Sequence, residues 1–251
     1  MNEPDNSIAD SVSIVMVEPQ SPGNIGMVCR AMKNMGLSRL RLVKGCDRFH
    51  PESLKFAVSA KDLLERAELY DDLASALADC ALTVGTTRRH GKYRQEILSP
   101  PQVATLLRTR AQGDCRGALV FGREDSGLTT DELSLCRWHA TIPTSSEYGS
   151  LNLSQAVLLF CYELGKASDS PGGGRTEIPA TSAEMETLFS QMDTSLQRIG
   201  FLNEQNPGHI MRSLRRILFR SELDNRELAI LRGMFSQVDW ACSGFDGRKR
   251  L

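Results

Sequence analysis

The chain lacks any apolar run long enough to cross a membrane as a helix. Such a helix needs about 20 consecutive apolar residues, and no run in the 251 residues approaches that length. The first residues also lack the basic stretch, apolar core and small-residue cleavage site of a secretory signal. We therefore expect a cytoplasmic protein without a membrane partner.

Paired cysteines are missing as well. The chain has seven cysteines, an odd number, and no two of them form a CxxC pair. This distribution indicates neither a disulfide framework nor a zinc site, and the histidines have no partner at metal-ligand spacing. We expect no metal, and we expect buried apolar roles for the cysteines, which are Cys29, Cys46, Cys80, Cys115, Cys136, Cys161 and Cys242.

An excess of either charge is absent too. The 30 lysines and arginines nearly balance the 31 aspartates and glutamates, so the formal net charge is -1. Without an overall basic character, the chain could hold a nucleic acid only through local basic patches. The composition, 41% hydrophobic and 24% charged, is that of an ordinary globular protein.

The common phosphate-binding loops are not found either. A β-branched apolar run at 12–17 predicts the first strand, and the turn after it contains Pro22-Gly23-Asn24-Ile25-Gly26. That turn fits neither GxGxxG nor GxxxxGK[ST], the fingerprints of dinucleotide-binding and P-loop proteins. Their absence argues against a nucleotide-dependent oxidoreductase or kinase.

The chain does contain a repeated alternation of strand-length apolar runs with helical patterns. Further strands are predicted at 40–43, 82–85 and 118–121, and helices at 28–35, 53–67, 73–79, 101–110 and 130–136. This alternation is typical of a parallel sheet with helices on both faces, and such sheets bind ligands beyond the carboxyl ends of their strands. We therefore expect an α/β domain.

A flexible linker is predicted at 165–182, where Gly, Pro and Ser replace any periodic pattern. It separates a domain of residues 1–164 from a helical extension of residues 183–251. The extension carries three apolar stripes at helical spacing, and a core of about 60 residues is marginal alone. We therefore expect it to dock onto another surface, in a two-fold homodimer.

The stretch 141–164 combines an extended run, a small-residue loop and a helix capped by Asn152 or Ser154. A helix N-terminus attracts a carboxylate or a phosphate, and Gly149 and Ser150 let a ligand approach the main chain. The pattern indicates a ligand-binding loop. An ordinary strand-to-helix connection would have the same pattern.

Three segments of the chain, taken in order, resemble the motifs of the SpoU branch of the SPOUT methyltransferases. They are PGNIGMVCRAMKNMG at 22–36, LVFGREDSGL at 119–128 and IPTSSEYGSLNLSQAV at 142–157. Each is weak alone, but the ordered set is specific. The helical tail, from Asn206 to Met234, is similar to the C-terminal extension of the TrmJ subfamily.

The resemblance implies a fold and a reaction. The fold would be a SPOUT-type parallel sheet with a C-terminal trefoil knot, followed by a small all-α extension. The reaction would be S-adenosylmethionine-dependent 2′-O-methylation of the ribose of nucleotide 32, a cytidine or uridine, in the anticodon loop of tRNA. Two alternatives stay open: a SpoU enzyme acting on ribosomal RNA or another tRNA position, and a non-catalytic RNA-binding SPOUT protein.

The resemblance also assigns site residues by matching position. Arg30 would clamp the substrate phosphate and polarise the ribose hydroxyl, since a guanidinium is too basic to act easily as a base. A structural ion pair between Arg30 and Glu124 is the alternative. The expected catalytic set is Asn24, Arg30, Glu124 and Asn152, and the expected cofactor-binding set is Thr86, Thr87, Arg88, Gly122, Ile142, Gly149, Ser150 and Leu151.

Two groups of cations are candidates for contact with the tRNA partner. One group lies in the loop after the strand at 82–85, and the other lies on one face of the second tail helix. A solvated charged face is the alternative explanation for both groups. The RNA substrate that the resemblance implies favours contact with RNA. The residues are Arg89, Lys92, Arg94, Arg212, Arg215, Arg216 and Arg220.

Overall fold

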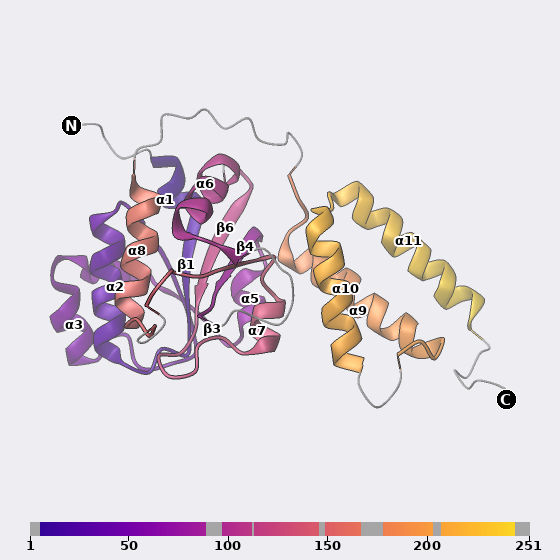
Figure 1. The fold of residues 1–251 in the computed structure, drawn as a ribbon, viewed down its shortest axis with the longest axis horizontal. Helices are drawn as coiled ribbons and strands as arrows, with labels where there is room; N and C mark the ends of the chain where they lie inside the picture. The colour runs from indigo at the N-terminus through magenta and orange to yellow at the C-terminus, as the bar shows by residue number, and fades with distance from the viewer. Residues whose placement is uncertain are drawn as a thin grey trace. The chain divides into compact units, whose positions relative to one another are not determined.

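The computed structural model describes residues 6–88, 97–111, 113–145, 149–166, 178–202 and 207–243. The chain divides into two compact units, Met1–Thr176 and Glu177–Leu251 (Figure 1). Each unit is described by itself below. None of the helices in these described ranges is both long and apolar enough to span a membrane.

Unit 1 alternates strands and helices, as the sequence pattern predicts. Its strands are β1 (Val12–Val17), β2 (Arg39–Val43), β3 (Glu68–Tyr70), β4 (Cys80–Thr86), β5 (Ile97–Leu98), β6 (Arg116–Phe121) and β7 (Trp138–Ala140). Its helices are α1 (Asn6–Ser11), α2 (Pro22–Asn34), α3 (Pro51–Ala57), η1 (Val58–Ala60), α4 (Lys61–Arg66), α5 (Leu73–Leu77), α6 (Pro100–Arg110), α7 (Thr130–Ser134) and α8 (Leu153–Gly165).

The strands form one seven-stranded sheet in the order β3-β2-β1-β6-β4-β7-β5, and every pairing is parallel. Later strands are inserted between earlier ones, because β6 lies between β1 and β4, and β7 lies between β4 and β5. The loops that follow β1, β6, β4 and β7 therefore leave the sheet at one edge, side by side.

Helices cover both faces of the sheet, which confirms the predicted fold class. In β1, Ile14 and Met16 point into the core shared with α2, α4, α6 and α8, whereas Val15 and Val17 point into the core shared with α5. Figure 1 shows α2 and α8 on one side of the sheet and α5 and α7 on the other. Because helices cover both faces of the sheet, side chains on both sides of a strand are buried, and the strands are therefore mostly apolar runs.

Some elements differ from the sequence prediction. The single helix expected at 53–67 is three short elements, α3, η1 and α4, because Val58 has a φ of 51°, which an α-helix cannot contain. The strands β3, β5 and β7 were not predicted, since two or three residues are too few to show a period-2 pattern.

Unit 2 consists of α9 (Ser182–Arg198), α10 (Pro207–Ser221) and α11 (Asn225–Ala241). Their inner stripes form a small core that includes Leu188, Phe189, Phe219 and Phe235. Residues 167–177 of the expected linker lie outside the described residues. Ala180, also inside that stretch, is buried, and its N–H donates to the Leu223 carbonyl at 2.8 Å, so the packed unit begins before α9.

All seven cysteines are free thiols. The expected buried role is confirmed for Cys29, Cys80, Cys115, Cys136 and Cys161, and is wrong for Cys46 and Cys242, which are partly exposed. Burial raises the pKa of the Cys29 thiol to about 12. Such a thiol stays protonated and unreactive at neutral pH.

Candidate active site at the carboxyl edge of the sheet

Glu124 joins the loop after β6 to the turn before α2, more than a hundred residues earlier. Its carboxylate accepts hydrogen bonds from the main-chain N–H groups of Gln20 (2.9 Å) and Ser21 (3.1 Å), and from Asn24 Nδ2 (2.9 Å). Burial alone would raise the pKa of Glu124, but these donors hold it below its ordinary value of 4.5. The ionised carboxylate therefore stabilises the N-terminus of α2.

Asn24 and Arg30 both belong to α2 but have different surroundings. Asn24 is only 3% exposed and gives its amide nitrogen to Glu124, whereas its Oδ1 has no partner among the described residues. Arg30 is exposed, and within the described ranges its guanidinium forms no ion pair. The alternative ion pair between Arg30 and Glu124 is therefore not formed. Arg30 is available to a bound molecule, and Asn24 holds Glu124.

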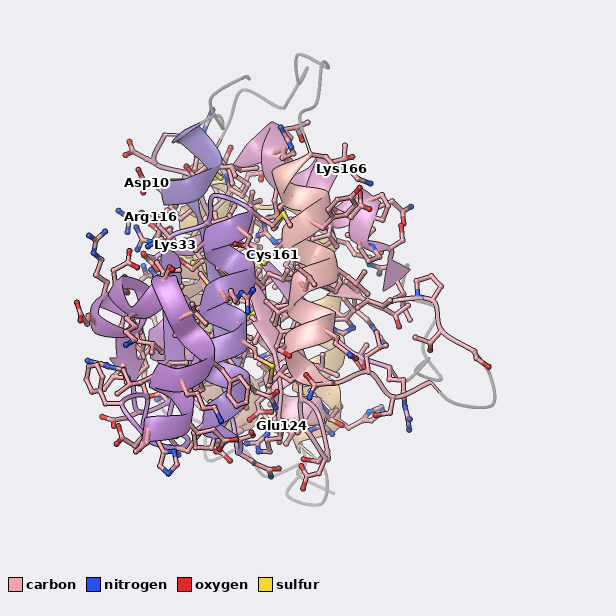
Figure 2. The ribbon with its side chains drawn as sticks, turned by 90° about the vertical axis from the view of Figure 1, so that its left-hand side faces the viewer. Asp10, Lys33, Arg116, Glu124, Cys161 and Lys166 are labelled. Carbon is pink, nitrogen blue, oxygen red and sulfur yellow. The ribbon has the colours of Figure 1, made fainter. Side chains whose placement is uncertain are left out.

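Asn152 caps α8, and Ser154 connects that helix to α2. Its Oδ1 accepts a hydrogen bond from Ser154 N at 2.9 Å, which satisfies a donor of the first helical turn. Ser154 Oγ lies 3.8 Å from Met27 Sδ, and Met27 is three residues from Arg30 on α2, on the same side of the helix. Figure 2 shows α2 and α8 side by side, with Glu124 at the end where both helices begin.

The expected cofactor residues follow three neighbouring strands. Thr86, at the end of β4, donates through Oγ1 to the Val120 carbonyl of β6 at 2.8 Å. The Thr87 N–H donates to the Ala140 carbonyl of β7 at 2.9 Å. These bonds hold the ends of β4, β6 and β7 together, directly before Gly122 and Ile142.

Two glycines allow close approaches of these loops. A Cβ on Gly122 would lie 2.2 Å from the Gly127 carbonyl carbon, so no other residue fits there. Arg123 and Gly127 exchange main-chain hydrogen bonds of 3.3 and 3.0 Å, which close the loop between them. A Cβ on Gly149 would lie 3.7 Å from Arg88 Cδ, so the loop before α8 lies beside Arg88.

The structure adds Arg123, which the sequence reasoning did not single out. Its Nε donates to Glu18 at 2.8 Å, and its terminal nitrogens donate to both carboxylate oxygens of Glu132 at 2.9 and 3.0 Å. Hydrogen bonding by Arg123 lowers the pKa of Glu18. At Glu132 burial is the largest effect and raises the pKa, but the hydrogen bonds from Arg123 and Thr129 and the charge of Arg123 together lower it. The signal in the sequence was a charged Arg-Glu pair one glycine after the apolar run at 118–121.

Comparison with known proteins decides the family. A model of the SpoU rRNA Methylase family matches residues 11–162, which contain every element of this site. The chain belongs to the SpoU methylase family. A second family model, the C-terminal domain of the tRNA methyltransferase TrmJ, matches residues 183–247, which contain α9 from its second residue on, α10 and α11.

Similar proteins extend over nearly the whole chain. A curated tRNA (cytidine/uridine/adenosine-2′-O-)-methyltransferase TrmJ of Pseudomonas aeruginosa is 35% identical over 96% of this chain and 98% of its own. The tRNA (cytidine/uridine-2′-O-)-methyltransferase TrmJ of Salmonella typhimurium is 36% identical over 91% of this chain and 96% of its own. The crystal structure of TrmJ from Z. mobilis ZM4 matches with a TM-score of 0.81 at 34% identity, covering 90% of this chain and 98% of that one.

The expected RNA-binding residues of this SpoU protein fall into two groups. Arg89, Lys92 and Arg94 lie outside the described residues. On α10, Arg220 is exposed, whereas Arg215 forms a two-pronged ion pair with Glu186 and lies over the Phe189 ring at 4.3 Å. Arg215 therefore holds α10 against α9. Among the described residues no group of three His, Cys, Asp or Glu side chains could hold a metal ion.

Proposed function

We propose that this protein transfers a methyl group from S-adenosylmethionine to the 2′-hydroxyl of a ribose in tRNA, at nucleotide 32 of the anticodon loop, in the cytoplasm. The observation that carries the proposal is the joint match of a SpoU domain and a TrmJ C-terminal domain on one chain. Proteins named as tRNA 2′-O-methyltransferases align with both parts.

The loops after β4, β6 and β7 have the chemistry that this cofactor requires. Ile142 is half-buried and Leu151 is 37% exposed, so both offer apolar surface to an adenine ring. Arg88 is exposed beside Gly149 and offers a cation to a carboxylate. S-adenosylmethionine supplies an activated methyl group when it is bound.

Arg30 is the residue assigned to the substrate. Its planar guanidinium binds a substrate phosphate through two parallel hydrogen bonds and orients the neighbouring ribose hydroxyl. Positioning of this kind is a large part of the rate acceleration in a displacement at carbon. The exposure of Arg30 supports this assignment.

Glu124, Asn24 and Asn152 are assigned to holding Arg30 in place. Glu124 and Asn24 bind the N-terminal turn of α2 to the loop after β6. Asn152 caps α8 at Ser154, whose hydroxyl contacts Met27, three residues before Arg30 on α2. The three side chains thus fix both helix ends near the hydroxyl that is to be methylated.

We propose further that the protein is a two-fold homodimer through α8. The outer side of α8 leaves Leu158, Leu159 and Tyr162 between 40% and 50% exposed, and Leu151, two residues before the helix, is 37% exposed. Exposed apolar side chains of this kind suit contact with a second subunit. Since the face begins at the cofactor loop, a second subunit there would also close that loop from solvent.

The test is methylation of a purified tRNA transcript with labelled S-adenosylmethionine, followed by mass-spectrometric mapping of the nucleosides. We expect one methyl group on the ribose of nucleotide 32 and none when that ribose is replaced by 2′-deoxyribose. Transfer that survives the replacement would exclude the ribose as target. Methylation of ribosomal RNA or of another tRNA position would favour the first alternative, and failure to bind S-adenosylmethionine would favour a non-catalytic RNA-binding protein.

A further inference from the structure

Two neighbouring residues of the loop after β6 bind two neighbouring parts of the loop after β1. Arg123 binds Glu18, the residue that follows β1, and Glu124 binds the Gln20 and Ser21 main chain just beyond it. The two side chains lie next to each other in the sequence but serve opposite ends of the same short turn. The turn is therefore fastened at both ends to one loop.

The Arg123 side chain is also held in place by Glu132. Both carboxylate oxygens of Glu132 accept from the Arg123 guanidinium, and one of them also accepts from the Thr129 N–H at 2.7 Å in the capping box of α7. The side chains of Arg123 and Glu132 are only 16% and 17% exposed. A fork of this kind, shielded from water and joined to a helix cap, holds a guanidinium in one orientation.

Glu18 provides the second anchor, and its backbone is unusual. Its φ of 47° lies in the left-handed region, which a non-glycine residue adopts only under constraint. Two contacts stabilise that conformation: the Glu18 N–H donates to the Val43 carbonyl at 2.8 Å, and its carboxylate accepts from Arg123. The direction in which the chain leaves β1 toward Asn24 thus depends partly on Arg123.

We propose that Arg123, gripped by Glu18 and Glu132, is a positioning element for methyl transfer: it sets the placement of Glu124 and of the first turn of α2, and through them of Arg30, without touching substrate or cofactor. The catalytic part of this inference rests on the proposed function. Its structural part does not, because it concerns the hydrogen bonds from Gln20 and Ser21 to Glu124.

The variants that test it are conservative. Glu132→Gln keeps an oxygen that can accept from the Thr129 N–H, so α7 stays capped, but it loses the charge that pairs with Arg123. Glu18→Gln removes the other charge, and Arg123→Lys keeps the cation but loses the fork. Asp62→Asn is the matched control, since it removes an ion pair with Lys33 at the far end of α2 and outside this cluster.

The first measurement is hydrogen exchange of the Gln20 and Ser21 amides in the full-length protein. Their protons should exchange about tenfold faster in Glu18→Gln and Glu132→Gln than in the wild type and Asp62→Asn, because Glu124 is then less firmly placed. Exchange unchanged from the wild type would overturn the proposal. This readout needs no enzyme activity, so it separates failure of the positioning role from failure of the proposed function.

The second measurement is turnover on tRNA at a temperature where all variants are folded. We expect kcat to fall about tenfold in Glu18→Gln and Glu132→Gln, with the KM for tRNA and the affinity for S-adenosylmethionine within about twofold of the wild type. In a Glu124→Gln background, adding Glu18→Gln should lower kcat no further, because both changes act through the placement of the residue 124 side chain. A full additive loss, or lowered thermal stability with unchanged kcat, would show that the cluster is only structural.

Discussion

The two units of this chain enclose their apolar residues to different degrees. In unit 1 the sheet lies between two helical layers, and every residue of β1 is at most 2% exposed. In unit 2 each helix buries one stripe, and α11 leaves Ile230 at 64% and Trp240 at 76% exposed. A layered α/β unit is closed on both sides, whereas three short helices have too little surface to enclose each other.

The units also use arginine in two comparable ways. Unit 1 ties Arg123 to two glutamates and leaves Arg30 exposed, and unit 2 ties Arg215 to Glu186 and leaves Arg220 exposed. Arginines on one helix face look alike in the sequence. The presence of a carboxylate partner in the fold separates those that stabilise the protein from those that remain exposed.

The largest expected effect tests the difference in packing. Phe160→Ala removes a ring that is 1% exposed and lies edge-on to Phe121, with ring centroids 5.7 Å apart, and it should cost about 3–5 kcal/mol of unfolding free energy. Trp240→Ala should change that free energy by less than about 0.5 kcal/mol. Urea unfolding followed by circular dichroism measures both. A comparable loss for Trp240→Ala would mean that another surface covers α11.

The next largest effect is expected at Arg30, the exposed arginine of unit 1 that was contrasted above with the paired Arg123. Arg30→Ala should lower turnover on tRNA by about a hundredfold or more, because a substrate-positioning group is lost. The affinity for S-adenosylmethionine, measured by calorimetry, should stay nearly unchanged. Equal loss of cofactor affinity would show that Arg30 supports the cofactor loops instead of the substrate.

A smaller effect is expected from Arg220, an exposed arginine of unit 2. Replacing Arg220 with glutamine should weaken binding of all tRNAs and flatten the slope of log affinity against log salt by about one unit. Arg215→Gln is the contrasting variant, and it should lower the stability of unit 2 because Glu186 then loses its partner. Fluorescence anisotropy at several salt concentrations measures the slope, and a slope that is unchanged by the Arg220 substitution would place the RNA elsewhere.

The smallest expected effect is on the free energy of unfolding at acidic pH. The pKa values of Glu18, Glu124 and Glu132 are lowered from 4.5 by their hydrogen bonds, although burial opposes this at Glu124 and Glu132. A lowered pKa adds stability above the unfolded value, and that stability is lost as pH falls through the folded value. Unfolding free energy in urea should therefore decline below about pH 4.5, and the decline should be shallower in Glu124→Gln. An identical decline in that variant would contradict the role of Glu124.

Much of this architecture follows from local pattern. The continuous apolar runs of β1 and β6 indicate strands buried on both faces, and the three stripes of the tail predict α9, α10 and α11. The order of the three motifs assigned Asn24, Glu124 and Asn152 to one site by resemblance, and the structure brings Asn24 and Glu124 within hydrogen-bond distance. The strand and helix inferences use residues close together in the chain, where apolar spacing and helix caps act directly.

Only the tertiary structure decided which residues meet. No local pattern places β6 between β1 and β4, gives Val58 its left-handed backbone, or gives Asn24 Nδ2 to a carboxylate a hundred residues later. The same holds for the pairing of Arg123 with Glu18 and of Arg215 with Glu186. Such contacts depend on the register of strands and helices that pack across long loops, and a side chain finds its partner only when that packing has brought the two within hydrogen-bond distance.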